Sequence, residues 1–484
     1  MKYFLVFCIY IDMKKTRFFY GKNFWLLVLL GWLLLLNAAA ELNLGEGGHI
    51  EDKQESRQEN AADEMSVSES EMPSMEAGTP SGERETLSAS AATSAEDEML
   101  SAEKQASRQQ DTDGVENGEE ALESKFENPD IRVLLMDSDY KTYYHPSVTV
   151  TANGKTMTFD GNSPELSDGS LVLDGKEDGI QVSSIKRMEN PPIYKGTLEI
   201  RKTTSGLLLI NALPLETYLE AVVPSEMPAS YEMEALKAQA VCARTYARKQ
   251  MEEGSLEAEY GADVDDSVNY QVYGNFYPKE QSSQAVKETA GQVLRQNGEL
   301  INAYYFSTSA GATSTDEIWG ADEAAPYLKS VSCSFDAEEP WSRWSVEIPW
   351  SAVNDRTGIL EGCSGELLSL QIVKKNQSGA VTGLLVTTEG GSCQLSQEYE
   401  IRQLLSPQGC MITEMDGTET KGGTLLPSAY FTLDVEPGSC FTVTGSGYGH
   451  GVGMSQTAAN EMAKEGYAWE EILNYFFQNI QIGI

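Results

Sequence analysis

Hydrophobic and polar positions alternate in short runs from about residue 131 onwards. The stretches IRVLLM at 131–136 and SVTVTA at 147–152 are rich in apolar or β-branched residues. Such runs are typical of β-strands, because successive side chains point to opposite faces of a sheet. Further along, TLEIRK and LLLI flank a glycine turn, and a helical pattern follows them. The pattern therefore predicts strand, turn, strand and helix over 197–223.

A longer helical pattern follows, over about 230–250. At about 100° per residue, four small or apolar residues share one face: Leu236, Ala240, Ala243 and Ala247. Small side chains on that face predict a helix packed closely against a neighbour. Arg244 lies at the edge of the same face, so we expect its side chain to point into a partly buried site.

A single carboxylate stands between these two helices. Glu226 is flanked by Pro224 and Pro228, whose fixed φ angles stiffen the backbone on both sides. Pro214 falls at the start of the preceding helix, where its missing N–H costs nothing, and we expect that helix to stop at Pro224. The residues by themselves leave two interpretations of Glu226 open: a helix-capping turn, or an acid held in place for chemistry.

The remaining patterns indicate more strands and then more helices. RWSVEIPW, LLSLQIV and GLLVTTE are predicted strands of a β-rich insertion at about 335–440. The C-terminal ILNYFF is predicted to end a buried helix. Taken together, the elements predict a mixed α+β protein, with central helices and a β-sheet in one domain over 129–484 and a β-rich inserted subdomain.

Composition separates the first 128 residues from the rest. Between 41 and 128 the chain carries 24 acidic and 6 basic residues, and from 41 to 125 it has no aromatic residue. Such a segment buries too little apolar surface to offset its ordering entropy, so we predict a disordered acidic linker. The net charge of −39 also argues against nucleic acid as a partner, because binding it requires a basic surface.

The first 40 residues have the layout of an export signal. An apolar run over 24–36 leads into the small residues Ala38 and Ala40, and basic residues precede it: Lys14, Lys15, Arg17 and Lys22. We expect either a cleaved signal peptide or a retained membrane anchor, since about 17 residues is the lower limit for spanning a bilayer. Either way the rest is exported, as a membrane-anchored or a secreted protein. The start is either Met1 or Met13.

The cysteines and histidines do not indicate a metal centre. Six of the seven cysteines follow the N-terminal segment, an even number in a compartment that could oxidise them. Cys242 falls within the alanine-rich helix, where a buried thiol is expected. The other pairings stay open, with one bridge, two or none among Cys363, Cys393, Cys410 and Cys440. The three histidines are scattered and have no cysteine at metal-ligand spacing.

Two long motifs resemble those of a known bacterial family. LPLETYLEAVVPSEMPASYEMEALKAQAVCARTYA, at 213–247, resembles the central motif of the stage II sporulation protein D and amidase enhancer LytB family. GSGYGHGVGMSQTAANEMAKEGYAWEEILNYFF resembles the closing motif of that family. AYYFSTSAGATSTDEIWG and PYLKSV resemble the segment between them. The resemblance runs in order from about residue 192 to the C-terminus.

The resemblance implies peptidoglycan as the substrate. Enzymes of this family are lytic transglycosylases that prefer glycan strands stripped of stem peptides. They act in sporulating bacteria during engulfment of the forespore, beside an amidase and a membrane partner. The motif glutamate, here Glu226, corresponds to the catalytic acid of the family. The resemblance also assigns substrate contacts to Arg244, Tyr327 and Lys329, with Tyr327 stacking on a sugar ring.

A single carboxylate suits this reaction. A hydrolytic glycosidase needs two carboxylates, whereas in a lytic transglycosylase the C6 hydroxyl of the sugar attacks C1 and leaves a 1,6-anhydro end. Glu226 would protonate the leaving oxygen and then accept the hydroxyl proton, so we expect burial to raise its pKa. We expect Arg244 not to touch Glu226, because a cation would keep the carboxylate ionised.

Metal ligands that some relatives carry are missing here. Those relatives hold zinc near the AYYFSTSAGAT segment, but Phe306 stands at the histidine position and no cysteine is close. We therefore predict no metal and no other cofactor. The polar loop that includes Ser309 is expected to line a sugar groove, with His450 and Gln456 at its rim. The His450 imidazole is either a structural group, a hydrogen-bonding wall or a second proton-transfer group.

Two functions stay open at this point. The first is a peptidoglycan lytic transglycosylase, with glycan strands, a cell-wall amidase and a membrane protein as partners. The second is a non-catalytic wall-binding activator of an N-acetylmuramoyl-L-alanine amidase. The intact PSEMP at 224–228 favours the enzyme, because a scaffold has no need of the carboxylate. For Trp341, Trp344 and Trp350 in the insertion, core packing is the default role and a glycan-gripping arm is the alternative.

Overall fold

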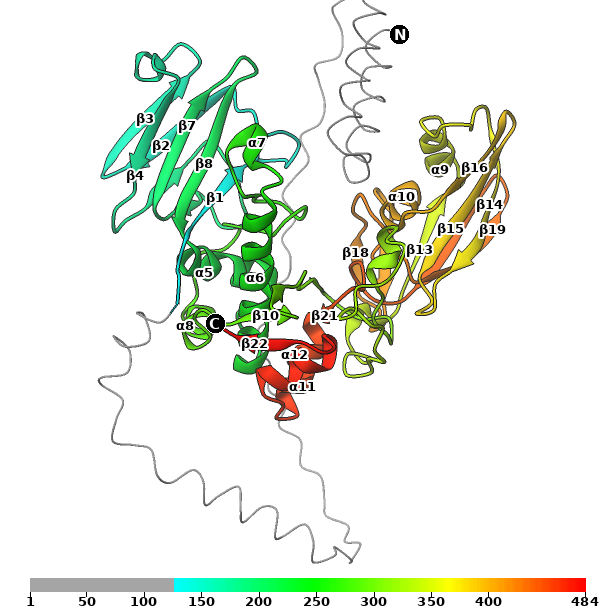
Figure 1. The fold of residues 1–484 in the computed structure, drawn as a ribbon. Coiled ribbons are helices and arrows are strands. Elements are labelled where there is room, and N and C mark those ends of the chain that lie inside the picture. Colours follow the sequence, from blue (N-terminus) through cyan, green and yellow to red (C-terminus); the bar gives the residue numbers. More distant parts are fainter. Residues whose placement is uncertain (1–125) are drawn as a thin grey trace, which may run out of the picture. The chain divides into compact units, whose positions relative to one another are not determined.

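A computed structural model describes residues 126–484, shown in Figure 1. The predicted export segment and nearly all of the predicted acidic linker lie outside the described residues, so both stay predictions. The described part is a mixed α+β structure, which confirms the predicted fold class. None of its helices is both long and apolar enough to cross a membrane.

Two sheets form the first part of the described chain. The first has the strand order β4–β7–β8–β1–β9, and the second the order β3–β2–β5–β6. All neighbours are antiparallel except β1 and β9, which are parallel. The predicted strands at 131–136 and 147–152 are confirmed as β1 and β2. The bounds are β1 Asp130–Leu135, β2 Ser147–Ala152, β3 Lys155–Asp160, β4 Ser170–Asp174, β5 Ile180–Val182, β6 Ile193–Tyr194, β7 Thr197–Lys202, β8 Leu207–Pro214 and β9 Val264–Asp265.

Three helices pack against one another next in the chain: α5 (Leu215–Glu226), α6 (Met233–Glu253) and α8 (Glu280–Glu288). The predicted small-residue face of α6 is confirmed, because all four of its members are fully buried. Gly254 ends α6 in the left-handed conformation with φ 60°, which a residue without Cβ adopts at no steric cost. The short helix α7 (Glu257–Tyr260) follows it.

The end of α5 differs from the sequence-based prediction. The helix does not stop at Pro224 but continues through it to Glu226. Proline removes only the backbone donor that would bond the Glu220 carbonyl, and the Ser225 hydroxyl donates to the next carbonyl, that of Ala221, at 2.7 Å. The Met227 N–H then bonds the Val223 carbonyl and closes the last turn. Glu226 is therefore the last helical residue, with extended backbone directly after it.

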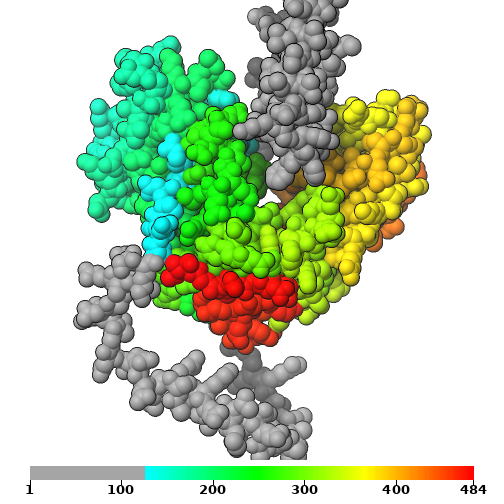
Figure 2. All heavy atoms as spheres, viewed as in Figure 1, coloured from blue at the N-terminus to red at the C-terminus, as the bar shows by residue number. Residues whose placement is uncertain are grey.

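The C-terminal segment returns to the same helices. Helices α11 (Gln456–Lys464) and α12 (Trp469–Phe476) both pack on α6, and Figure 2 shows this red segment against the green one. Strand β22 (Gln481–Gly483) joins β10 (Val293–Gln296), which also pairs with β11 (Glu299–Leu300). Strand β12 (Tyr305–Phe306) runs parallel to β21 (Met454–Ser455), so the middle and closing motifs meet in one small sheet.

Residues between these two motifs form a β-rich part with a hydrophobic cluster of its own. One sheet has the order β18–β17–β13–β20–β19 and the other β14–β15–β16. Trp344 is 2% exposed and Trp350 stacks on Phe441, so both tryptophans pack in this core. The bounds are β13 Trp344–Pro349, α9 Trp350–Thr357, β14 Leu367–Lys375, β15 Val381–Thr388, β16 Gly391–Leu395, α10 Glu398–Leu404, β17 Met411–Glu414, β18 Glu419–Lys421, β19 Phe431–Glu436 and β20 Cys440–Gly445.

The structure narrows the open question of cysteine pairing. All six cysteines of the described residues are free thiols, and Cys242 is fully buried in α6 as expected. The sulfurs of Cys363 and Cys393 are 2.8 Å apart. Cys440 lies instead beside the Glu436 carboxylate, with Sγ at 4.0 Å from Oε2. Among the four cysteines of the β-rich part, only Cys363 and Cys393 have their sulfur atoms in contact.

Candidate active site

A cavity of about 370 Å³ opens where four segments of the chain converge. These segments are the C-terminal end of α5, the loop that follows β9, the β12 strand and the glycine-rich closing motif. Its walls are mainly aromatic, and Glu226 is the one carboxylate among the described residues that line it. The lining residues are Glu226, Tyr246, Val268, Asn269, Tyr270, Val272, Tyr304, Tyr305, Phe306, Ser307, Trp319, Tyr448, Gly449, His450 and Gln456.

Glu226 reaches this cavity from the last turn of α5. Its Oε1 accepts a 2.6 Å hydrogen bond from the Val272 N–H, and the nearby Tyr305 side chain also acts on its carboxyl group as a donor that lowers the pKa. Burial raises the pKa of Glu226 to about 7, and these two hydrogen bonds only partly offset that effect. A carboxyl group with this pKa is partly protonated near neutral pH, which is what a general acid requires.

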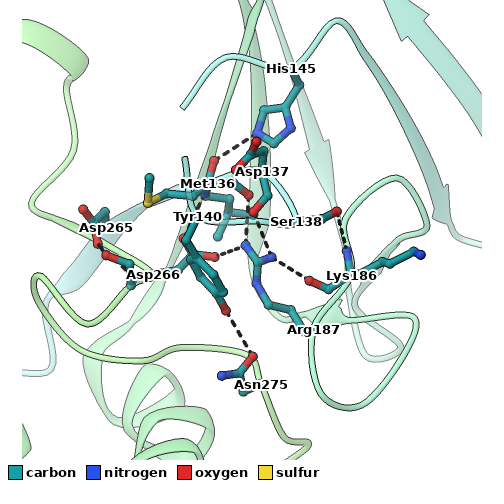
Figure 3. Close-up of polar contacts among 12 residues, drawn as sticks. Met136, Asp137, Ser138, Tyr140, His145, Lys186, Arg187, Asp265, Asp266 and Asn275 are labelled. Atoms are coloured by element: carbon teal, nitrogen blue, oxygen red, sulfur yellow. Dashed lines mark hydrogen bonds and ion pairs between the residues drawn. The ribbon is translucent and has the colours of Figure 1, made fainter. Parts of the chain in front are cut away.

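The loop over 266–276 supplies the Val272 N–H, and a buried ion pair outside the cavity lining holds this loop in place. Arg187 and Asp266 pair with no exposed side-chain surface, and Asp266 Oδ1 also accepts the Met136 N–H at 2.9 Å (Figure 3). The Arg187 guanidinium lies over the Tyr140 ring, 4.4 Å from its centroid. The Tyr140 hydroxyl in turn donates to Asn275 Oδ1 at 3.1 Å. The loop is thus attached at both ends to the N-terminal sheets.

The glycine-rich motif approaches the middle motif too closely for side chains. A Cβ on Gly453 would lie 2.0 Å from the Tyr304 carbonyl oxygen, and one on Gly449 would lie 2.8 Å from the Phe306 Cβ. Both glycines also have positive φ, 83° and 106°, which L-residues rarely adopt. The glycines therefore allow the backbone contact that places His450 in the cavity.

His450 lines the cavity as a neutral ring. Its Nδ1 accepts the Val452 N–H at 3.1 Å, so the neutral ring carries its proton on Nε2. Burial lowers the pKa of His450 to about 3, and Arg402 contributes in the same direction. The ring is therefore neutral near pH 7 and forms part of the cavity wall.

Gln456 is placed beside the candidate acid, at the first position of α11. Its Nε2 donates to the Glu226 carbonyl at 3.2 Å and to Gln239 Oε1 at the same distance. Gln456 lines the cavity, as the sequence-based prediction places it. It connects the start of α11 to the end of α5, so the closing motif contributes directly to the position of Glu226.

Arg244 is not part of the cavity. Its side chain is 1% exposed and forms a bidentate ion pair with Glu216, with Nε–Oε1 and Nη2–Oε2 distances of 2.7 Å. Nη2 also donates to the Val286 carbonyl and Nη1 to the Gln292 carbonyl. Arg244 is thus fully buried, where the sequence predicted a partly buried site, and these contacts occupy the guanidinium and join α5, α6 and α8. The expected contact with substrate therefore has no structural support.

Ser309, Tyr327 and Lys329 also lie outside the residues that line the cavity. Ser309 is 2% exposed and its hydroxyl donates to Asp336, which also accepts from Ser455. Ser309 thus links two loops through Asp336 and is not among the residues that line the cavity. The Tyr327 hydroxyl accepts the Asn302 N–H at 3.2 Å, and Lys329 is exposed.

Most residues of the cavity wall were not predicted from the sequence. Tyr246, Tyr270, Tyr304, Trp319 and Tyr448 all line it. Tyr448 is 43% exposed and packs edge-on against Trp341 at 4.8 Å. The repeated tyrosines of AYYF and of the loop at 270–277 were a usable signal. Aromatic rings of this kind stack on sugar rings, so the wall suits a glycan better than a charged ligand.

The donor set does not resemble a metal centre. Phe306 lines the cavity next to His450, where a relative with zinc would have a ligand. In the part of the chain that the structure describes, no group of three or more His, Cys, Asp or Glu side chains is arranged to hold a metal ion. The absence of a resident metal stays a prediction.

Comparisons with known proteins match the two motifs. A family model described as stage II sporulation protein matches residues 203–295, which include Glu226 and Val272. A second model, described as a domain of unknown function (DUF8618), matches residues 328–453, which include the β-rich part.

Curated relatives are similar to more than half of this chain. The stage II sporulation protein D of Bacillus subtilis is 32% identical over 331 residues, which cover 63% of this chain and 88% of that protein. Its counterpart in Bacillus amyloliquefaciens is 30% identical over 290 residues, 56% of this chain and 75% of that protein. The amidase enhancer of Bacillus subtilis is 30% identical over 300 residues, 54% of this chain but only 39% of the enhancer.

Proposed function

Because this chain belongs to the family of stage II sporulation protein D and the amidase enhancer, we propose that it is a peptidoglycan lytic transglycosylase. The substrate is a glycan strand, preferably one stripped of stem peptides, and the process is remodelling of the cell wall during sporulation. Glu226 is the general acid. The export segment and acidic linker would carry the domain to the wall side of the membrane.

One observation supports this proposal above the others. The cavity has a single carboxyl group among its described lining residues, and that group has a pKa of about 7. A hydrolase would need a second carboxylate about 5–10 Å away as nucleophile or base. In the transglycosylase reaction the substrate replaces that second group with its own C6 hydroxyl.

The proposed reaction balances in two proton transfers. Glu226 gives its proton to the leaving glycosidic oxygen as the bond from that oxygen to C1 breaks. The C6 hydroxyl oxygen of the same sugar forms the new bond to C1, and its proton passes to the Glu226 carboxylate. The products are a free hydroxyl end and a 1,6-anhydro end, with the acid regenerated and no water consumed.

Product analysis of the Glu226→Gln protein tests this function. The described domain, residues 126–484, is incubated with stem-free glycan strands, and the products are identified by mass spectrometry. We expect anhydro ends with the wild type and none with Glu226→Gln. The matched control is Glu220→Gln, since Glu220 is a half-buried carboxyl on the same helix but outside the cavity. Anhydro ends from Glu226→Gln at the wild-type rate would refute the proposal.

A second function rests on the similarity to the amidase enhancer. A non-catalytic activator would bind the wall and stimulate an N-acetylmuramoyl-L-alanine amidase without breaking glycosidic bonds. Mixing the protein with a purified amidase and intact wall separates the two functions. An activator would stimulate the amidase equally as wild type and as Glu226→Gln. If the protein is the proposed enzyme, Glu226→Gln should stimulate the amidase less than the wild type does, because it no longer cuts the strands.

A further inference from the structure

Three buried or half-buried polar side chains form a chain that ends on the candidate acid. The Tyr218 hydroxyl is 3.2 Å from Gln271 Oε1, and Gln271 Nε2 is 3.1 Å from the Tyr305 hydroxyl. The Tyr305 side chain shares the cavity lining with Glu226 and lowers the pKa of its carboxyl group, as a hydrogen-bond donor does. Tyr218 and Gln271 have no exposed surface, whereas Tyr305 lines the cavity. These residues come from α5, the loop over 266–276 and β12.

The direction of each hydrogen bond in this chain follows from one backbone carbonyl. The amide of Gln271 also contacts the Ala243 carbonyl at 3.3 Å, and a carbonyl oxygen can only accept. The atom that faces it must therefore be the Nε2 amino group and not Oε1. Its second hydrogen points to the Tyr305 hydroxyl oxygen, while Oε1 is left to accept from Tyr218.

The Tyr305 hydroxyl is thereby oriented toward Glu226. Its oxygen already accepts a hydrogen bond from Gln271, so its own proton is free to be donated elsewhere. The remaining partner is the Glu226 carboxyl, which also accepts from the Val272 N–H at 2.6 Å. Two donors, one backbone and one phenolic, therefore point at the carboxyl group from different segments.

We propose that Tyr305 is a further catalytic residue, a hydrogen-bond donor that stabilises the Glu226 carboxylate at the moment its proton leaves. Gln271 and Tyr218 are positioning residues, which act by fixing the direction of the Tyr305 hydroxyl. This inference rests on the proposed function for its catalytic meaning. A donor of fixed direction needs no reorganisation during the reaction, and it acts most strongly where water is excluded.

The titration of Glu226 reports on this contact, because the neighbouring groups do not change charge over the same pH range. The titratable groups around the carboxyl are His450 and the tyrosines 218, 246, 270, 304, 305 and 448, and no Lys, Arg, Asp or second Glu is among the described residues lining the cavity. Burial raises the pKa of tyrosines 218, 246, 270, 304 and 305 and lowers that of His450. These six groups are therefore neutral between pH 5 and 8, where Glu226 titrates.

The test is the Tyr305→Phe variant of the described domain, which removes one hydroxyl and keeps the ring. The Glu226 titration is followed by carboxyl-carbon NMR, with Glu226→Gln used to assign the signal. Without its donor the carboxylate is less stable, so we expect the titration to move to higher pH, by about one unit for a tenfold loss. On glycan strands we expect kcat to fall about 10- to 100-fold with KM unchanged, as for a lost hydrogen bond to a charged group.

Tyr273→Phe is the matched control. Tyr273 is a buried tyrosine of the same loop, and its hydroxyl donates to Asn211 Oδ1 at 2.7 Å, away from the cavity. Its loss should lower the melting temperature but leave the Glu226 titration in place. If Tyr305→Phe does not fold, Gln271→Met serves instead, because it frees the Tyr305 hydroxyl to rotate and should move the titration in the same direction by less.

The outcomes separate this inference from the proposed function. A Glu226 titration that Tyr305→Phe or Gln271→Met leaves unchanged overturns the inference, whatever the enzyme assay shows. A shifted titration in a protein that never makes anhydro ends supports the contact and refutes the transglycosylase. A shifted titration with unchanged kcat confines Tyr305 to a structural role and also overturns the inference.

Discussion

At the scale of single residues, the candidate site holds one acid at the end of one helix. The pKa of Glu226 is about 7 because burial disfavours its charged form, and the donors from Val272 and Tyr305 limit that effect. The resemblance implies that Arg244 contacts the substrate, but its guanidinium forms an ion pair with Glu216. An acid without a neighbouring cation can stay protonated, and this is the physical condition that the proposed chemistry requires.

A buried acid of this kind should destabilise the fold at high pH. Its pKa rises from 4.5 in the unfolded chain to about 7 in the folded one, so the folded state binds more protons between these values and loses stability as the pH rises. Above pH 7 the cost is about 3 kcal/mol, at about 1.4 kcal/mol per unit.

Glu226→Gln should therefore be more stable than the wild type at pH 8 and about equally stable at pH 4.5. Urea unfolding at the two pH values measures the difference. The exposed carboxylate Glu419 provides the control, since Glu419→Gln should change stability little at either pH. The same stability gain for Glu226→Gln at both values would contradict the raised pKa.

At the scale of elements, ion pairs hold the helices and the loop that carry the site. Arg244 joins α5, α6 and α8 through Glu216 and two backbone carbonyls. Arg187 and Asp266 attach the loop over 266–276 to Met136, the residue directly after β1. Both pairs are buried, so removing one partner leaves a charge without compensation.

Arg244→Met should cost about 3–5 kcal/mol of unfolding free energy, as expected for breaking a buried pair. The KM for glycan should stay that of the wild type in the fraction that folds, because Arg244 does not line the cavity. Chemical denaturation and steady-state kinetics measure the two quantities. Lys237→Met on the same helix is the control, and its partly exposed pairs should contribute at most about 1 kcal/mol. A raised KM with unchanged stability would restore the substrate role.

Asp266→Asn should loosen the loop that presents the Val272 N–H. Arg187 would stay buried without its carboxylate, so we expect faster hydrogen exchange across 266–276 and a lower kcat. Exchange mass spectrometry of that peptide measures the effect. Asp139→Asn, which breaks an exposed pair with Lys141, should change neither quantity. Wild-type exchange in Asp266→Asn would show that the ion pair does not hold the loop.

At the scale of the whole molecule, the residues at the predicted boundary between linker and domain contact the start of α5. Helix α5 has no side-chain cap of its own at Pro214. Asn128 Oδ1 instead accepts the Glu216 N–H at 3.0 Å, and the Pro129 carbonyl accepts the Leu215 N–H. The last residues assigned to the linker thus cap a helix that ends in the candidate acid.

A chain that begins at residue 126 should melt at the same temperature as the full chain, because we predict that the linker before this residue is disordered. A chain that begins at residue 131 should melt lower, since α5 loses acceptors for two of its first N–H groups. Asn128→Ala alone should cost about 1 kcal/mol, as for a lost helix cap. Calorimetry of the three chains measures these differences. Equal melting temperatures for all three would show that α5 needs no cap from this segment.

Local patterns of the sequence were sufficient for much of the fold. The alternation of apolar and polar residues identified β1 and β2, and the helical spacing of small and apolar residues identified the buried face of α6. They failed at the end of α5, because a proline in the last turn removes only one hydrogen bond, and the bonds from Ser225 and Met227 to the preceding turn remain. They also did not indicate the contacts of Ser309 and Arg244, because the partners, Asp336 and Glu216, are far from them in the sequence.

By itself the sequence determined the strands, the helices and a lone glutamate between two prolines, because φ restriction and periodicity act over a few neighbouring residues. Only the tertiary structure decided what surrounds that glutamate. The Val272 N–H, the Tyr305 hydroxyl and the His450 ring reach the cavity from positions 46 to 224 residues away, and only packing sets contacts over that separation. The same packing excludes water, and the exclusion of water raises the pKa of Glu226 toward the range of a general acid.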